Sequence, residues 1–179
     1  MKLLLRLCWL IMTQRWRSRC SILGPVDTKL VVFPSDLDTL MHVNNGVFFT
    51  YADLGRVDLL LRANAMKRLQ KLGWYPVVAA ESMQFKKSLT LGQVFSIRTE
   101  VLGWSDKSIY LQQIFSRHGR MIARAMIDAR FLKRSGGTVN LEELLDHLEI
   151  NSPSPEFPDY LHHWIASNKA SRESSSIDT

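Results

Sequence analysis

The chain of 179 residues has the size of one domain, and its 46% hydrophobic content excludes an intrinsically disordered protein. The formal charge of +6 and a pI near 9.5 indicate negatively charged partners: a nucleic acid, an anionic membrane or a phosphorylated small molecule. The two cysteines, Cys8 and Cys20, are too few for a disulfide framework and lie outside any metal-ligand cluster. We therefore expect a reducing, cytoplasmic location and no metal site.

Residues 1–24 form a basic, amphipathic N-terminal segment. Arg6 interrupts its apolar run, and the stretch 7–12 is far shorter than the roughly 18 residues of a membrane span; no cleavage site follows. Two interpretations stay open: a helix lying peripherally on an anionic membrane, or a helix or tail that touches the body of the protein or a partner subunit. We expect the core to begin near Thr28, so that residues 1–20 are dispensable for folding.

Residues 25–150 begin with a strand and two helices. A β-branched stretch at 28–34 ends at Pro34 and predicts a strand. Apolar residues then recur at helical spacing from 46 to about 62, which predicts a largely buried helix. A second helix, "AMKRLQKLG", is expected to end at its glycine.

The remainder of this region is predicted to be mostly strands, at 74–85, 93–104, 107–117 and 120–134. The short connections "SD" and "HG" favour hairpins and an antiparallel meander of the last three. Alternation along the strand 93–104 places Ile97, Thr99 and Val101 on the face covered by the helix. It places Phe95 or Arg98 off that face. With the apolar helix as cover, the sequence predicts an α+β fold, a long central helix wrapped by an antiparallel sheet.

The end of the chain is less regular. A short helix "NLEELLDHL" is expected to begin at a cap residue, Asn140. Residues 151–179 read as an extension, with the proline-rich "NSPSPEFP", a short helix "DYLHHWIASN" and a disordered polar tail.

The stretch "PSDLDTLMHVNNGVFFTYADLGR", residues 34–56, places acids, a histidine and two asparagines just before the long helix. Taken alone, Asp36 and Asp38 are typical of turn-forming or capping acids. Together with "ESMQFKKSLTLG", "VLGWSDKSIYL" and "EFPDYLHHWIASNKAS", the stretch resembles the hotdog-fold acyl-CoA thioesterases of the 4-hydroxybenzoyl-CoA thioesterase type, especially the branch of thioesterase superfamily member six and its bacterial relatives. The resemblance covers roughly residues 27–170.

This resemblance implies a hotdog fold that hydrolyses an acyl thioester to free acid and CoA, with CoA as part of the substrate and no cofactor. It also implies a homodimer or tetramer whose sheets join edge to edge. Asp38 falls at the position of the family's catalytic carboxylate, as a general base or a nucleophile. The N–H groups of Asn45 and Gly46 at the helix N-terminus would hold the oxyanion, and His42 would polarise the substrate or hold the loop by hydrogen bonds.

Four basic residues could bind the phosphates of CoA. Alternatively, they are solvent-exposed charges that protect a sheet edge. The candidates are Lys86, Lys87, Arg117 and Arg120. Nucleic-acid binding is not expected, because aromatic residues do not interleave with a basic stripe.

Two residues depart from the family pattern. Met41 stands where many such thioesterases have Gly before the histidine, and Gly would let the loop take backbone angles that Met does not readily adopt. Gln93 follows Gly92 where an aspartate is usual. A catalytically silent hotdog module that binds acyl thioesters or a protein partner is therefore the alternative function.

Overall fold

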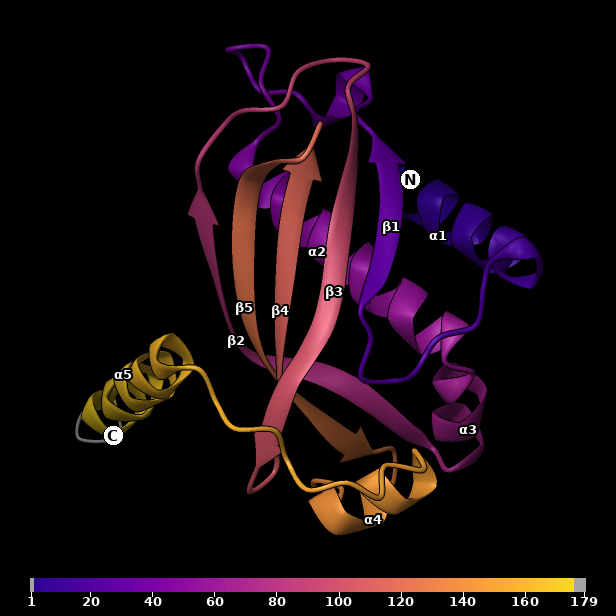
Figure 1. Ribbon diagram of the computed structural model, residues 1–179, viewed down its shortest axis with the longest axis vertical. Coiled ribbons are helices and arrows are strands. Elements are labelled where there is room, and N and C mark those ends of the chain that lie inside the picture. Colours follow the sequence, from indigo (N-terminus) through magenta and orange to yellow (C-terminus); the bar gives the residue numbers. More distant parts are fainter. Residues whose placement is uncertain (1, 176–179) are drawn as a thin grey trace.

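The structure, a computed structural model, describes residues 2–175 as a twisted antiparallel sheet curved around one long helix (Figure 1). The five strands lie in the order β1-β3-β4-β5-β2. Their bounds are β1 Val26–Val31, β2 Trp74–Phe85, β3 Val94–Ser105, β4 Ser108–Arg117 and β5 Arg120–Lys133. The predicted α+β arrangement, with a helix covered by the sheet, is confirmed.

The central helix, α2, spans Asn45–Arg62 and buries its apolar face against the sheet. Tyr51 packs on Phe95 with ring centroids 5.0 Å apart, and Phe95 stacks on Phe115. Phe95 therefore faces the core, and the prediction that set it apart from Ile97 was wrong, because residues two apart on a strand share one face.

Gly55 allows α2 to approach the sheet closely. A Cβ atom at this position would lie 2.6 Å from the side-chain amide nitrogen of Gln113 and 2.9 Å from Thr99 Oγ1. Gln113 is fully buried and donates to Ala52 O and Thr99 Oγ1, both at 2.9 Å. Polar side chains of the sheet thus meet the helix backbone where no helix side chain intervenes.

The predicted meander of β3, β4 and β5 is confirmed by the strand pairing. Arg117 pairs with Arg120, and the two residues between them, His118 and Gly119, have φ angles of 50° and 71°. Two positive φ angles are characteristic of the type I′ turn, whose twist matches that of the paired strands.

The N-terminal segment forms a helix, α1 (Lys2–Thr13), that continues into a 3-10 turn, η1 (Gln14–Trp16). Leu10 of α1 is fully buried in the main core, and Arg6, one turn earlier, is 7% exposed. The core therefore begins well before Thr28, contrary to the expectation from sequence. Within residues 2–175, no helix is long and apolar enough to cross a membrane.

Three further helices complete the fold. α3 (Ala65–Lys71) follows α2, and α4 (Leu141–His147) is capped by Asn140 as predicted, with Asn140 Oδ1 accepting from the backbone N–H groups of Glu142 and Glu143. The last helix, α5, spans Asp159–Ser175.

The length of α5 corrects the predicted short helix and disordered tail; residues 176–179 of that tail lie outside the described residues. Leu161 is fully buried beside Tyr110 and Met126, on the sheet face opposite α2. Arg172, near the end of the helix, donates to Asp128 Oδ2 at 2.9 Å. These two contacts hold both ends of a polar helix against the sheet.

Candidate active site

The loop of residues 33–44 connects β1 to α2 at one end of the sheet (Figure 1). It starts with a 3-10 turn, η2 (Pro34–Asp36), and then folds back on itself, because Leu37 pairs with Val43 and Asp38 N donates to His42 O at 2.8 Å. Met41 lies at the tip with φ of 60°. The chain thus adopts at Met41 the left-handed conformation for which glycine is best suited, at a cost of about 1 to 2 kcal/mol.

The carboxylate of Asp38 organises this tip. Its Oδ1 accepts hydrogen bonds from the backbone N–H groups of Leu40, at 2.9 Å, and His42, at 3.2 Å. The side chain is half-buried. Asp38 therefore forms the turn through Oδ1.

The N-terminus of α2 supplies backbone donors close by in the chain. Asn44 is the cap residue, and its Oδ1 accepts from Gly46 N at 2.8 Å. The Gly46 donor is therefore already in use, whereas no described residue accepts from Asn45 N–H. The donor with free capacity, aided by the helix dipole, is that of Asn45.

Asn45 also lines a pocket of about 250 Å³ that contains two of the candidate phosphate-binding residues, Lys86 and Lys87. Both lysines are exposed, and the apolar part of the pocket comes from Val43, Phe48 and Phe85, its remaining residue being Ser88. The loop after β2 is held against the motif loop, because Val43 N donates to Leu89 O at 2.8 Å. A helix N-terminus and two cations thus face one cavity.

Arg117 and Arg120 lie at the β4–β5 hairpin, at the same end of the sheet. The backbone N–H groups of Lys86 and Lys87 both donate to Ile122 O, at 2.8 and 3.1 Å, which links the two regions. Neither arginine lines the pocket that holds the lysines. The four predicted basic residues are therefore neighbours, but only the lysine pair lies at the helix N-terminus.

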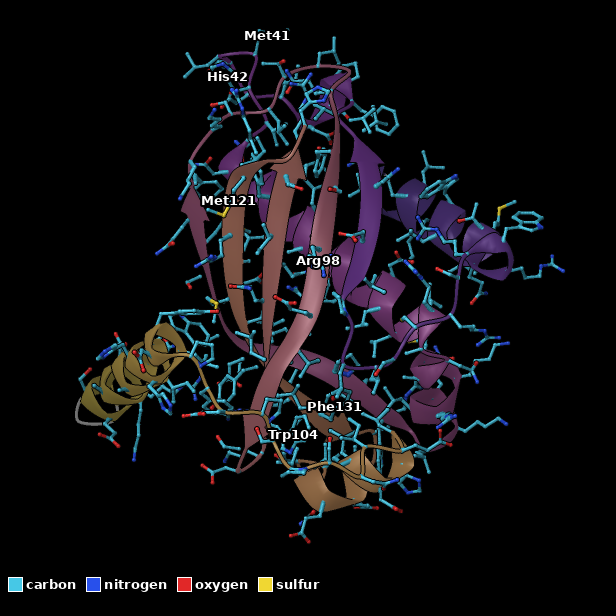
Figure 2. The ribbon with its side chains drawn as sticks, viewed as in Figure 1. Met41, His42, Arg98, Trp104, Met121 and Phe131 are labelled. Carbon is cyan, nitrogen blue, oxygen red and sulfur yellow. The ribbon has the colours of Figure 1, made fainter. Side chains whose placement is uncertain are left out.

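Met41 and His42 lie at the outer tip of the loop, at the top of Figure 2. Both side chains are exposed. His42 contributes to the loop through its backbone, which bonds to Asp38 and pairs with Thr90. Asp38 likewise lies outside the lining of the 250 Å³ pocket, so within one chain the structure groups Asn45 with the lysines and keeps Asp38 and His42 on the adjoining loop.

Asp36, which the sequence suggested to be structural, is 2% exposed and forms an ion pair with Arg6 of α1. Burial alone would raise the pKa of Asp36, but hydrogen bonds from the Arg6 guanidinium and from Phe33 N hold the pKa below its ordinary value. Tyr51 is buried alongside, and burial together with the Asp36 carboxylate raises the pKa of its phenol. Sequence reasoning missed Arg6, because a charge inside an apolar run gives no sign of a partner 30 residues away.

A second polar cluster lies halfway along α2. Arg56 forms ion pairs with Asp53 and with Glu81 Oε1, the latter at 2.9 Å, and donates to Gln113 Oε1 at 3.0 Å. Asp53 lies one helical turn before Arg56 on α2, whereas Glu81 and Gln113 lie on the sheet. Arg56 thus ties α2 to both β2 and β4.

Beyond this cluster lies an apolar cleft of about 350 Å³ between α2 and the sheet. Trp104 and Phe131 line it, and Figure 2 shows both at the end of the sheet away from Met41 and His42. Asp53 and Arg56 are its charged lining residues, and nearly all others are apolar. A cleft of this composition accommodates a flexible apolar group.

The sequence of residues 32–165 matches the model of the thioesterase-like superfamily. The chain belongs to this superfamily. It is 29% identical over 143 residues to protein THEM6 of Xenopus laevis, an alignment covering 80% of this chain and 68% of the relative. The hotdog thioesterase resemblance and its branch are thereby confirmed.

Solved structures of thioesterase-like proteins share the fold. The crystal structure of YbaW, a probable thioesterase from Escherichia coli, superposes with a TM-score of 0.64 at 22% identity, covering 69% of this chain and 96% of the other. A hypothetical protein, SAV2348 from Staphylococcus aureus, in complex with CoA, gives a TM-score of 0.61 at 14% identity and covers 80% and 96%. The hotdog fold predicted from sequence is confirmed.

Proposed function

We propose that this member of the thioesterase-like superfamily hydrolyses an acyl-CoA to the free acid and CoA. The observation that carries the proposal is the convergence of the α2 N-terminus with Lys86 and Lys87 on one pocket, beside the loop that bears Asp38. A thioester needs donors for its oxygen, a carboxylate for water and cations for the CoA phosphates. These elements lie together at one end of the sheet.

The proposed chemistry uses Asp38 as general base. A water bound to Asp38 Oδ2 gives its proton to the carboxylate while its oxygen attacks the thioester carbon. The carbonyl oxygen takes up negative charge and is stabilised by the Asn45 N–H and the helix dipole. The carbon–sulfur bond then breaks, and CoA leaves as a thiolate, which takes a proton from solvent or from Asp38.

The two halves of the substrate fit different surfaces. Lys86 and Lys87 are exposed point charges suited to phosphates, and the related structure of SAV2348 contains CoA. The apolar cleft between α2 and the sheet suits an acyl chain.

A second copy of the chain would complete the site. β2 is 12 residues long and hydrogen-bonds only with β5 in the described chain, so its other edge is open for pairing. Apolar side chains on this strand are exposed, namely Tyr75, Val78 and Phe85. Antiparallel pairing of two β2 strands would bring the Phe85 end of one copy, with its lysine pocket, toward the first half of β2 in the other, where Pro76, Val77 and Val78 line the apolar cleft.

The outward face of α1 supports peripheral contact with an anionic membrane. Exposed apolar side chains crowd this short segment, namely Leu4, Leu5, Trp9, Ile11, Met12 and Trp16, and Arg15 and Arg19 are exposed near its end. Binding to phosphatidylserine vesicles should fall when Met12 and Trp16 are both changed to Ser, and should weaken with salt. The control Leu91→Ser removes an exposed apolar residue elsewhere on the chain and should bind as wild type does. An equal loss of binding in both variants would count against the membrane contact.

One observation favours the alternative of a silent binding module. Asp38 Oδ1 and Gly46 N–H are both engaged in hydrogen bonds within the loop, so neither is free for a substrate. A module of this kind would bind CoA thioesters without turning them over.

The deciding experiment measures thiol release from a panel of acyl-CoAs by wild type, Asp38→Asn and Asp106→Asn. Asp106 is an exposed aspartate on the β3–β4 turn, where Asn is tolerated, and serves as the matched control. We expect Asp38→Asn to lose about a hundredfold or more of turnover with an unchanged circular dichroism spectrum, and the control to lose none. Equal turnover by all three would remove Asp38 from the mechanism, and CoA binding without hydrolysis by wild type would establish the silent module.

A further inference from the structure

Arg6 reaches from α1 into the base of the motif loop. Its guanidinium donates from Nη1 to Asp36 Oδ1 at 3.1 Å, and from Nη2 to Asp36 Oδ2 at 2.6 Å and to Val31 O at 3.0 Å. The aromatic rings of Phe33 and Tyr51 lie on it, with centroids 4.8 and 4.9 Å from the guanidinium carbon. This planar group is therefore held in one orientation by two hydrogen bonds to one carboxylate and by two rings.

Asp36 passes this constraint on to the residues at the candidate site. Its Oδ2 also accepts from Phe33 N at 2.7 Å, and its carbonyl oxygen accepts from Asn44 N at 2.9 Å. Asn44 in turn caps α2 through Gly46 N. A chain of direct contacts thus runs from α1 to the helix N-terminus, and Asp38 lies two residues after Asp36.

Loss of Arg6 would leave Asp36 as a buried carboxylate without a cation. Such a group must admit water, take up a proton or move to solvent, and each of these changes shifts the turn that carries Asp38 and Asn44. The side chains from Thr39 to His42 are exposed, so the tip is supported by hydrogen bonds and not by side-chain packing. The loop is accordingly the part of the chain most sensitive to Arg6.

We propose that Arg6 is a positioning residue for the loop 36–44, so that α1 takes part in building the active site although it lies outside residues 32–165, which match the superfamily. The inference rests on the proposed thioesterase function for its effect on turnover, but its effect on the loop is independent of any activity. Arg6 touches no substrate atom and acts through Asp36.

The test compares Arg6→Met with Arg17→Met. Arg17 follows α1 and also pairs with a buried aspartate, Asp58, but that aspartate faces β1 and accepts from Thr28 at 2.7 Å, away from the loop. Both variants therefore remove one ion pair between the N-terminal segment and the body. Arg6→Lys keeps the positive charge but cannot donate two parallel hydrogen bonds to the carboxylate, so it should rescue the loop in part. It also replaces Arg6→Met as the test variant if Arg6→Met does not fold.

The first measurement is amide hydrogen exchange of residues 36–44. We expect Arg6→Met to exchange faster there by about tenfold or more, Arg6→Lys to lie in between, and Arg17→Met to leave the loop unchanged. A uniform increase over the loop and β1, or the same loop exchange in Arg6→Met and Arg17→Met, would overturn the proposal, since either result reports general destabilisation.

The second measurement separates kcat from KM for an acyl-CoA that wild type hydrolyses. A misplaced loop should lower kcat by about tenfold to a hundredfold in Arg6→Met with little change in KM, because the backbone of Lys86 and Lys87 is bonded to Ile122 O of β5 and not only to the loop. Unchanged kcat in a folded Arg6→Met would also overturn the proposal. If wild type hydrolyses nothing, the proposed function fails, and the exchange measurement alone decides whether Arg6 positions the loop.

Discussion

Replacement of Leu10 by Ala tests whether α1 belongs to the folded core. Leu10 is 0% exposed and packs with the main cluster of buried residues. The change removes three side-chain carbon atoms from the core and leaves a cavity. Such substitutions cost about 2 to 5 kcal/mol of the free energy of unfolding, and Ala is the better helix former, so no loss arises from helix propensity. For a chain of this size the melting temperature should fall by about 2 to 4 °C per kcal/mol, or roughly 4 to 20 °C in all.

The assay is urea unfolding followed by circular dichroism, with Met12→Ala as the control. Met12 lies on the same helix but is 69% exposed, so its loss should change the free energy of unfolding by no more than about 0.5 kcal/mol. A Leu10→Ala midpoint equal to that of Met12→Ala would refute the reasoning. It would mean that α1 is undocked in solution and that residues 1–20 are dispensable, as the sequence alone suggested.

Three more predictions follow from particular contacts. Gly55→Ala should lower the free energy of unfolding by about 1 to 3 kcal/mol, because the new Cβ would lie 2.6 Å from the side-chain amide nitrogen of Gln113 on β4. This loss should exceed the gain from the better helix propensity of Ala. An unchanged urea midpoint would contradict the close approach of α2 to the sheet. Lys86→Glu with Lys87→Glu should raise KM for an acyl-CoA and not for a thioester lacking the nucleotide. Each lost exposed contact should cost about 1 kcal/mol of binding free energy, and less in high salt. Equal KM changes for the two substrates would place both lysines away from the phosphates. The pKa of Asp36 is depressed in the folded chain, so its contribution to stability is complete above the unfolded pKa of about 4 and is lost as the pH falls through the folded value. In Arg6→Met the same buried carboxyl should have a raised pKa. The difference in free energy of unfolding between wild type and Arg6→Met should therefore become smaller as the pH falls from 7 to 4, as measured by urea titration. A difference that does not change with pH would count against the ion pair.

The sheet and central helix could be predicted from sequence because their signals are local. The dipeptide His118-Gly119 supplies the positive φ angles of a two-residue hairpin, and the helical spacing of apolar residues from 46 onward marks the buried face of α2. The full extent of α5 could not be predicted in this way. Its second half is polar, and it is anchored by Arg172 to Asp128, a contact 44 residues away in sequence.

The motif loop illustrates the same limit at the candidate site. Resemblance identified Asp38, Asn45 and the lysines as candidates, and the structure brings Asn45 and the lysines to one pocket. Whether these residues catalyse hydrolysis remains a prediction. An asparagine just before a helix is typical of a cap residue. Asn44 is that cap in the structure, and its Oδ1 occupies Gly46 N–H, one of the two donors that the resemblance assigned to the oxyanion.

Met41 connects the loop's departure from the family pattern to its support by α1. A methionine at φ of 60° costs about 1 to 2 kcal/mol, which a glycine would not cost, so the loop must gain that energy from its other contacts. Two sources are visible: the Asp38 carboxylate accepts both Leu40 N and His42 N, and Arg6 holds Asp36 at the base of the loop. The first source ties up one oxygen of the residue proposed as the base, whereas the second involves no candidate catalytic atom. If Asp38 is to remain available for water, a chain with Met41 must rely on the Arg6–Asp36 ion pair to hold the loop. A relative with glycine at the tip would depend less on this ion pair, because its loop would not carry the cost of the left-handed conformation.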